Sequence, residues 1–177
     1  MAMYLDIPNI PGESASPNPN WNLKIEVQSA GYDLSQNASA QAGSGMIASQ
    51  VSFSPMHITK AMDRSTPHLF GKLAAGEPIA TVTLRVSRPG GSKTGVAGAQ
   101  GQGGLFEAET YTMSNVIVTS YHTTGTPGPG GLPMESWTFA FTAINEKFQT
   151  VDVTGKLNPP ASAGYDIAGG AALPPSN

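Results

Sequence analysis

Apolar and polar residues alternate along much of this chain, and this period of two is the feature that most constrains its fold. Residues 22–28 and 136–141 alternate almost residue by residue, while residues 79–86 and 106–121 are rich in β-branched and aromatic side chains. Side chains two positions apart share one face of a strand, so these segments predict half-buried β-strands. Weaker strand candidates are residues 3–7, 46–53 and 56–62.

One segment carries different signals and predicts a short helix over residues 65–76. Ser65 or Thr66 supplies an N-cap oxygen, and Pro67 stands in the first turn, where its missing N–H is not needed. Apolar residues then follow at helical spacing, and Gly76 can adopt the left-handed conformation of a C-cap. The helix is expected to lie on the side of the sheet or across the end of a barrel.

Glycine-rich segments separate the predicted strands. Residues 89–104 and 123–133 are long loops rich in glycine or proline, and residues 36–45 are small and polar. The predicted fold is all-β, with roughly seven or eight strands in a closed barrel or two packed sheets and one short α-helix on the side. This domain is expected over residues 1–156, followed by a flexible tail rich in Gly, Pro and Ala at residues 157–177.

Charge is scarce, and this excludes some functions. Only 12% of the 177 residues are charged and the net charge is −3, against about 25% charged residues in a typical soluble domain. The excess of acidic over basic residues argues against nucleic-acid binding through a basic surface. The absence of cysteine excludes disulfides and thiol nucleophiles, and neither a secretory signal peptide nor a membrane-spanning segment is expected. Much of the surface is therefore expected to contact something other than water.

No constellation of residues predicts an enzyme. The three histidines lack the spacing of a metal site. Glu107 and Glu109 are two residues apart on a predicted strand, so they are expected on one face, as acids on a wetted surface rather than a catalytic pair. Residues 90–95 contain the letters of a phosphate-binding loop, but not in the required order. We expect no catalytic residue, cofactor or metal.

The segment ITKAMDRSTPHL closely resembles the signature of the haemolysin-coregulated protein (Hcp) family, which forms the inner tube of bacterial type VI secretion systems. The family pattern is an apolar residue, Thr-Lys, two residues, Asp, a basic residue, Ser-Thr-Pro, one residue and Leu. The matching positions are Ile58, Thr59, Lys60, Asp63, Arg64, Ser65, Thr66, Pro67 and Leu69. Supporting matches, such as Glu135-Ser136, extend the resemblance over residues 1–155.

The resemblance implies a structural subunit without enzymatic activity. Six copies would form a ring, and stacked rings would form a tube inside a contractile sheath, with a baseplate, a VgrG-type spike at the tip and small effectors as cargo in the lumen. The protein would start in the bacterial cytoplasm and be secreted to the medium or a target cell without a signal peptide. No nucleic-acid partner and no membrane insertion are implied.

The resemblance also implies roles for particular residues. The extended loop that reaches the neighbouring ring corresponds to Gln36, Asn37, Ala38, Ser39, Ala40, Gln41, Ala42, Gly43, Ser44 and Gly45. The region that lines the lumen corresponds to Ser29, Ala30 and Gly31, where this chain lacks the two tryptophans of many members. Lys60 and Arg64 can pair with Asp63 or across the seam between subunits, and both pairings stay open.

Two other functions remain as alternatives. A phage-type tail-tube protein would share the fold and the ring but would assemble without the spike and effectors. A small β-barrel can also hold one ligand in its interior, although the apolar pattern here is that of an ordinary core.

Overall fold

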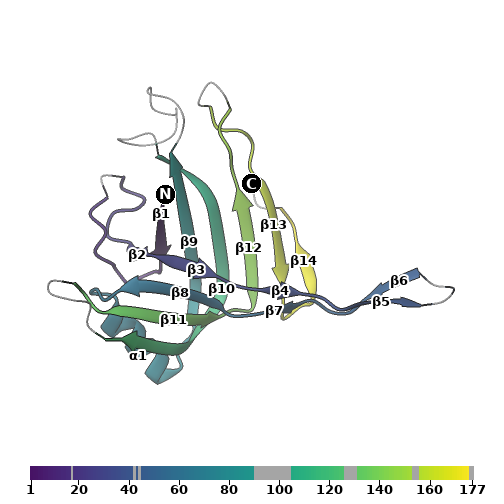
Figure 1. The fold of residues 1–177 in the computed structure, drawn as a ribbon, viewed down its shortest axis with the longest axis horizontal. Helices are drawn as coiled ribbons and strands as arrows, with labels where there is room; N and C mark the ends of the chain where they lie inside the picture. Colours follow the sequence, from purple (N-terminus) through teal and green to yellow (C-terminus); the bar gives the residue numbers. More distant parts are fainter. Residues whose placement is uncertain are drawn as a thin grey trace.

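The alternating segments form β-strands that wrap around one core (Figure 1). The computed structural model describes residues 1–16, 18–41, 43, 45–89, 105–125, 131–152 and 156–175. Residues 90–104 and 126–130 of the predicted loops 89–104 and 123–133, together with Ala42 and Ser44, lie outside these residues. The strands are β1 (Ala2–Asp6), β2 (Ile25–Val27), β3 (Ser29–Gly31), β4 (Leu34–Ser35), β5 (Ala38–Gln41), β6 (Gly45–Ala48), β7 (Ser52–Phe53), β8 (Met56–Ala61), β9 (Ile79–Pro89), β10 (Leu105–Thr124), β11 (Met134–Ala140), β12 (Ala143–Phe148), β13 (Ala161–Asp166) and β14 (Ala171–Leu173), and the helix is α1 (Thr66–Ala75).

A series of these strands closes into a barrel. Hydrogen-bonded neighbours follow the order β2, β1, β9, β10, β11, β8, β3. The two ends of this series, β2 and β3, are separated in the chain only by Gln28, whose N–H donates to the carbonyl oxygen of Thr59 over 2.8 Å. The predicted barrel with one helix on its side is therefore confirmed, and closure leaves few unpaired strand edges.

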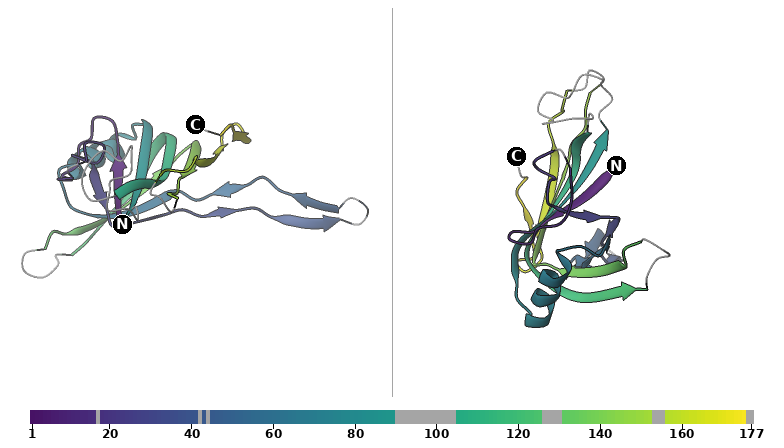
Figure 2. Two further views of the ribbon diagram at one scale, coloured as in Figure 1. Left: turned by 90° about the horizontal axis from the view of Figure 1, so that it is seen from above. Right: turned by 90° about the vertical axis from the view of Figure 1, so that its left-hand side faces the viewer.

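The long strand β10 belongs to both halves of the barrel. Its residues 105–116 pair with β9, and its residues 117–124 pair with β11. Near the junction of these two stretches lies Asn115 with a φ of 50°, a left-handed conformation that asparagine tolerates better than most residues. The strand turns there, so the sheet with β1, β9 and β12 stands at a steep angle to the sheet with β8 and β11 (Figures 1 and 2).

The core fills the space between these sheets. It consists of inward-facing aliphatic and aromatic side chains, with Leu5, Ile25, Val82, Met113 and Trp137 at 0% exposure. The strands β2 and β11, which come from the two strongest alternating segments of the sequence, contribute Ile25, Val27, Trp137 and Phe139 to this one cluster. The barrel interior is thus a packed core, as an ordinary apolar pattern predicts.

The predicted helix is confirmed with its boundaries. Pro67 lies in the first turn of α1, and Gly76 has a φ of 63° and donates its N–H to the carbonyl oxygen of Leu73 over 3.2 Å. Leu69 is fully buried against the barrel. A ten-residue helix is marginal alone in water, so this packing is what stabilises it.

Strand alternation breaks at Leu23 and between Glu107 and Glu109, among other places. Leu23 stands at the start of an alternating run, but it is exposed and has a φ of 55°, so β2 begins two residues later. In β10, Glu107 lies opposite Ser87 while Glu109 lies opposite Val86, which marks a β-bulge. The extra residue reverses the alternation, so the expectation that the two carboxylates share one face is wrong.

Residues 157–177 contain two strands where a flexible tail without regular structure was expected. β13 pairs with the whole length of β12, and β14 pairs with β13. Tyr165 stacks on Phe53 with ring centroids 5.5 Å apart, and a Cβ on Gly164 would lie 2.7 Å from Nδ2 of Asn145. Small residues without apolar periodicity form a strand here because β12 offers an open edge, which the local sequence does not reveal.

Candidate functional site

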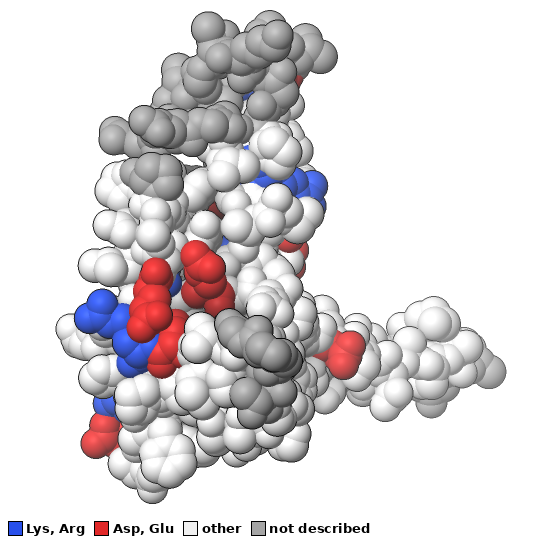
Figure 3. All heavy atoms as spheres, turned by 60° about the vertical axis from the view of Figure 1, so that its left-hand side comes forward, with Lys and Arg blue, Asp and Glu red and all other residues white. Residues whose placement is uncertain are grey.

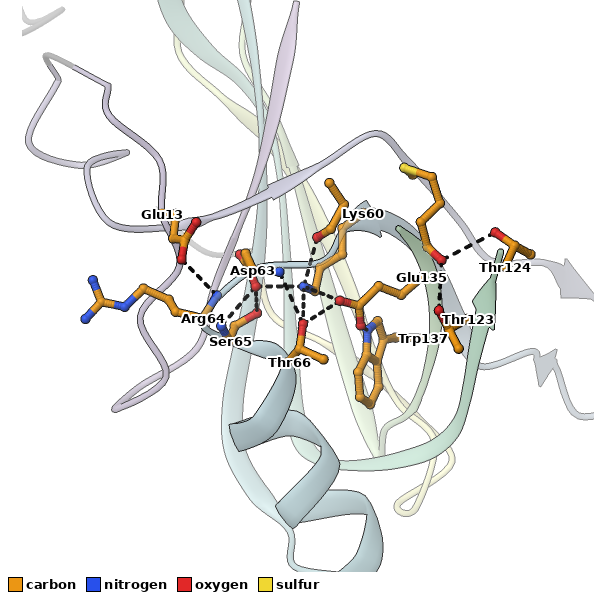
Figure 4. Close-up of polar contacts among 12 residues, drawn as sticks. Glu13, Lys60, Asp63, Arg64, Ser65, Thr66, Thr123, Thr124, Glu135 and Trp137 are labelled. Atoms are coloured by element: carbon orange, nitrogen blue, oxygen red, sulfur yellow. Dashed lines mark hydrogen bonds and ion pairs between the residues drawn. The ribbon is translucent and has the colours of Figure 1, made fainter. Parts of the chain in front are cut away.

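Lys60, the lysine of the motif, is fully buried in β8. Its ammonium lies 2.7 Å from Asp63 Oδ1 and 3.2 Å from each of three oxygens, Glu135 Oε1, Thr66 Oγ1 and the carbonyl oxygen of Ala61 (Figure 4). An ammonium has three protons, so these four oxygens share them. A buried charge is tolerated when it is paired and hydrogen-bonded, and here two carboxylates face the lysine.

Asp63, Ser65 and Thr66 form the turn that starts α1. The carboxylate of Asp63 accepts hydrogen bonds from the N–H of Ser65 at 2.9 Å and from the Ser65 hydroxyl. The N–H of Thr66 donates to the carbonyl oxygen of Asp63 over 3.0 Å. Ser65 is the N-cap residue, but its side chain makes no hydrogen bond to the helix. The carboxylate of Asp63 instead satisfies donors at this end, where the helix dipole also favours negative charge.

Glu135 completes the arrangement from β11. Its Oε1 accepts hydrogen bonds from Lys60 and Thr66, and its Oε2 accepts one from the indole N–H of Trp137 at 2.8 Å. The motif alone does not point to Glu135 or Trp137 as its partners. A signal was nevertheless present: Glu135 alternates with Trp137 and Phe139, which places an acid on the buried face of its strand and predicts a buried cationic partner.

We call these residues the Lys60 cluster, which comprises Lys60, Asp63, Ser65, Thr66, Glu135 and Trp137. The cluster joins β8, the start of α1 and β11 in one hydrogen-bonded group (Figure 4). One positive charge faces two negative charges, and both oxygens of Glu135 are engaged within it. Such a network suits an anchor that holds the helix on the barrel rather than a site of proton transfer.

The remaining motif residues lie apart from the cluster. Ile58 and Leu69 are buried in the core, Pro67 is exposed in the first helical turn, and Thr59 lies on the opposite face of β8. Arg64 is exposed, and its guanidinium points away from the cluster (Figure 4). The sequence left open whether Lys60 or Arg64 pairs with Asp63. Within one chain, Lys60 forms this ion pair, while Arg64 faces outward.

Residues 33–54 form an arm that projects from the body (Figure 2). Within it, β4 pairs with β7 and β5 pairs with β6. Of the predicted loop 36–45, residues 38–41 are therefore one strand of a hairpin and Gly45 begins the other, with Gly43 and Gly45 at φ values of 86° and 81°. The predicted strand 46–53 provides the other side. A polar segment can form a strand here because the two sides satisfy each other's backbone groups without a buried face.

The arm carries no Asp, Glu, Lys or Arg between residues 34 and 53. Leu34 is 57% exposed, Met46 is 72% exposed and Ile47 is 48% exposed. Figure 3 shows charged side chains gathered on the body, while the visible arm is white beyond an acidic side chain at its base. A two-stranded ribbon is marginal alone in water, and exposed apolar groups without charge indicate a surface for contact with another molecule.

The arm is packed against the body at its root. Phe53 stacks on Tyr165, and Tyr32 meets Tyr111 edge to face with centroids 6.1 Å apart. The hydroxyl of Tyr32 donates to Oε2 of Glu146 over 3.4 Å. Burial, and then the negative charge of Glu146, raise the pKa of Tyr32 and raise the pKa of Tyr111 to about 12. The root is thus a set of packed aromatic rings.

The outer face of the sheet formed by β3, β8, β11 and the end of β10 carries hydroxyl and imidazole groups. The strand register places two rows across it: Ser29, Thr59, Ser136 and His122, then Gly31, His57, Thr138 and Ser120. The hydroxyls of Ser29 and Thr59 are 2.6 Å apart, and Thr138 Oγ1 lies 2.7 Å from Ser120 Oγ and 3.0 Å from His57 Nδ1. We call these two rows the hydroxyl face, and it contains no Lys, Arg, Asp or Glu.

The three residues expected at the lumen do not share one face. Ser29 and Gly31 lie on the hydroxyl face, whereas Ala30 lies opposite Ile58 and packs against the core. Alternation along β3 is the reason. A Cβ at Gly31 would meet nothing within 4 Å, so this face is open at that position.

The acids considered for catalysis are paired with arginines. Glu107 accepts hydrogen bonds from Arg85 at 3.0 and 3.1 Å, and Glu109 accepts one from Arg88. Among the described residues, no group of three or more His, Asp or Glu is placed to hold a metal ion. Within the same residues, no helix is long and apolar enough to cross a membrane.

Comparison with family models matches residues 4–148 to the type VI secretion system effector Hcp. A solved type six secretion system protein has a TM-score of 0.82 at 21% identity, covering 97% of this chain and 99% of that one. Hcp1 from Salmonella typhimurium has a TM-score of 0.70 at 24% identity, with 97% and 98% covered. A type VI secretion system effector from Yersinia pestis has a TM-score of 0.65 at 21% identity, with 93% and 98% covered. No curated protein matches the sequence.

Proposed function

Because this chain belongs to the Hcp family of type VI secretion proteins, we propose that six copies form a ring and that the rings stack into a secretion tube. The family is structural and non-enzymatic, and its members are secreted through the type VI system. The observation that carries the proposal is the arm of residues 33–54. It projects from the body, bears exposed apolar groups and lacks charge from residue 34 to 53, so it needs a second molecule to cover it.

A repeating assembly needs subunits of constant shape, and the Lys60 cluster supports this requirement. It holds α1 to β8 and β11 through buried hydrogen bonds, which specify a single arrangement of the helix on the barrel. The surfaces on either side of α1 then keep the same geometry in every copy. Arg64 is exposed and directed away from the cluster, so it is available to an acid across the seam between subunits.

The hydroxyl face suits the wall of the channel. Its hydroxyl and imidazole groups offer hydrogen bonds, and it has no Lys, Arg, Asp or Glu to hold a passing molecule by an ion pair. Ser29 and Gly31 lie on the hydroxyl face and Ala30 lies behind it, so in the proposed ring the first two would face the lumen. Small effector proteins of either net charge can then occupy the lumen without electrostatic trapping.

The wider partners follow from the secretion system. The tube would lie inside a contractile sheath on a baseplate, with a VgrG-type spike at its tip, and it would pass from the bacterial cytoplasm to the medium or a target cell. Export by this machine would need no signal peptide. The family model is that of a type VI secretion protein, which favours this role over a phage tail tube.

Assembly of the purified protein tests the proposal. Light scattering is expected to give about six times the 18.2 kDa of the monomer, and negative-stain electron microscopy is expected to show rings. Shortening the arm by removing residues 38–48 should leave rings but abolish tubes and secretion. Ala74→Ser, on the exposed side of α1, serves as the unaffected control. A strict monomer at high concentration would contradict the proposal, and unchanged secretion would contradict the role of the arm.

A further inference from the structure

The outer strands of the arm are not covered by any other part of the chain that the structure describes. β5 and β6 form a separate two-stranded sheet that does not pair with the main sheet. From Leu34 to Gln41 the extended chain spans about 23 Å at about 3.3 Å per residue. Figure 2 shows these strands far from the body. The exposed Met46 and Ile47 are therefore free to enter a site on another molecule.

A groove lies where the arm leaves the body. It has a volume of about 340 Å³ and is walled by apolar side chains from the arm and from β12 and β13, namely Leu34, Val51, Phe53, Ile144, Ala163 and Tyr165. Among the described residues that line it, Glu146 alone is charged, and it accepts the hydrogen bond of Tyr32. The wall on β13 lies beyond residues 4–148, which the family model matches.

Groove and arm have matching chemistry. Both present exposed apolar side chains, and neither carries a Lys or Arg that would need an acidic partner on the other. A basic or acidic partner would find few complementary charges here, whereas apolar side chains gain from leaving water. The small residues Ala38, Ala40 and Ala48 on β5 and β6 let two backbones approach closely.

We propose that this groove receives strands β5 and β6 from the arm of a second copy, with Ile47 of the incoming arm against Ala163 and Tyr165 and with Met46, on the other face of β6, toward Leu34 on the opposite wall. The inference rests on the proposed function, because it names the acceptor surface for the arm within the tube. It also assigns a role to the C-terminal strands: β13 forms one wall of the acceptor. A copy that lacked β13 would still present an arm but could not receive one.

The chain contains no cysteine, so single cysteines give a clean cross-linking test. A preparation with Ile47→Cys is mixed with one carrying Ala163→Cys, and in a second pair with one carrying Leu34→Cys on the opposite wall of the groove. Docking raises the effective concentration of the two thiols to the millimolar range. Disulfide-linked dimers are therefore expected on the order of a hundredfold faster than in the control mixture of Ile47→Cys with Ala74→Cys, a position on α1.

The readouts separate this inference from the proposed function. Each variant is first checked for folding by circular dichroism and for rings by electron microscopy. Rings and tubes with fast cross-linking at Ala163 or Leu34 support the groove as acceptor. Rings and tubes without cross-linking at either position, or with equal cross-linking to Ala74, overturn the groove while the secretion tube stands. If the unmodified protein forms no rings, both the groove as acceptor and the proposed secretion tube are overturned.

Discussion

Replacement of Lys60 by methionine measures what the Lys60 cluster contributes to the fold. Methionine has a similar length and fills the space of the lysine stem without its charge. The carboxylates of Asp63 and Glu135 would then face each other without a cation. The side chain of Glu135 has no exposed surface and that of Asp63 has 12%. Removal of one partner from a buried ion pair costs about 3–5 kcal/mol.

This loss is large against the total stability of a domain, which is about 5–15 kcal/mol. Taking about 4 kcal/mol and a urea dependence of about 2 kcal/mol per molar, the midpoint of unfolding should fall by about 2 M. Circular dichroism in a urea series measures it, with all variants at one protein concentration because assembly adds apparent stability. The matched control is Lys72→Met, whose ion pair with Glu77 lies at the surface and should matter little.

A second substitution shows whether the cost comes from the unpaired carboxylates. In the double variant Lys60→Met with Glu135→Gln, one negative charge is removed, while the amide oxygen can still accept the hydrogen bond from Trp137. The double variant should be more stable than Lys60→Met alone. The reasoning fails if Lys60→Met shifts the midpoint no further than Lys72→Met, or if the second substitution only adds to the loss.

Three further outcomes are expected. Gly12→Ala places a Cβ 2.2 Å from the carbonyl oxygen of Lys24. This backbone clash should lower the free energy of unfolding by about 1–3 kcal/mol or more and so lower the urea midpoint. An unchanged midpoint would contradict the packing at Gly12. Gly31→Leu projects into open space, so it should keep fold and rings but reduce cargo carriage in a co-purification assay; equal loss of rings would mark a fold position instead. The pKa of Tyr111, raised to about 12 by burial and by Glu146, lies above its ordinary value of about 10. The unfolded chain therefore loses this proton first, and stability should fall between about pH 10 and 12; thermal melts should show a smaller fall for Tyr111→Phe, and an identical fall would refute the link.

The local features of this chain could be predicted because their causes are local. Pro67 and Gly76 limit α1 through their own backbone preferences, whatever surrounds them. Alternation in residues 136–141 similarly places Trp137 and Phe139 on one face before any partner strand is known. The resemblance of residues 58–69 to the Hcp signature agrees with the family match over residues 4–148.

The motif could be recognised from the sequence, but its partner could not be assigned. Lys60 meets Glu135 across 75 positions of the chain, and only the register of β8 against β11 brings them together. The placement of Glu135 among apolar residues indicates a buried acid, yet it does not say which cation lies opposite. The sequence separation of two residues does not show whether they are in contact, and this becomes known only once the pairing of their strands is known.

The sequence by itself determined the strand class, the limits of the helix and the family, since these depend on short-range periodicity and on residues with particular backbone preferences. Only the tertiary structure decided three other features: the pairing of β5 with β6 and of β4 with β7 into an arm, the addition of β13 to the edge of β12, and the bulge that separates Glu107 from Glu109. Each of these features depends on which strand pairs with which, and in what register. Backbone hydrogen-bonding groups are nearly identical in every residue, so they do not by themselves select a partner strand. The free energy that favours one pairing over another comes from contacts with residues far along the chain, which the local sequence does not reveal.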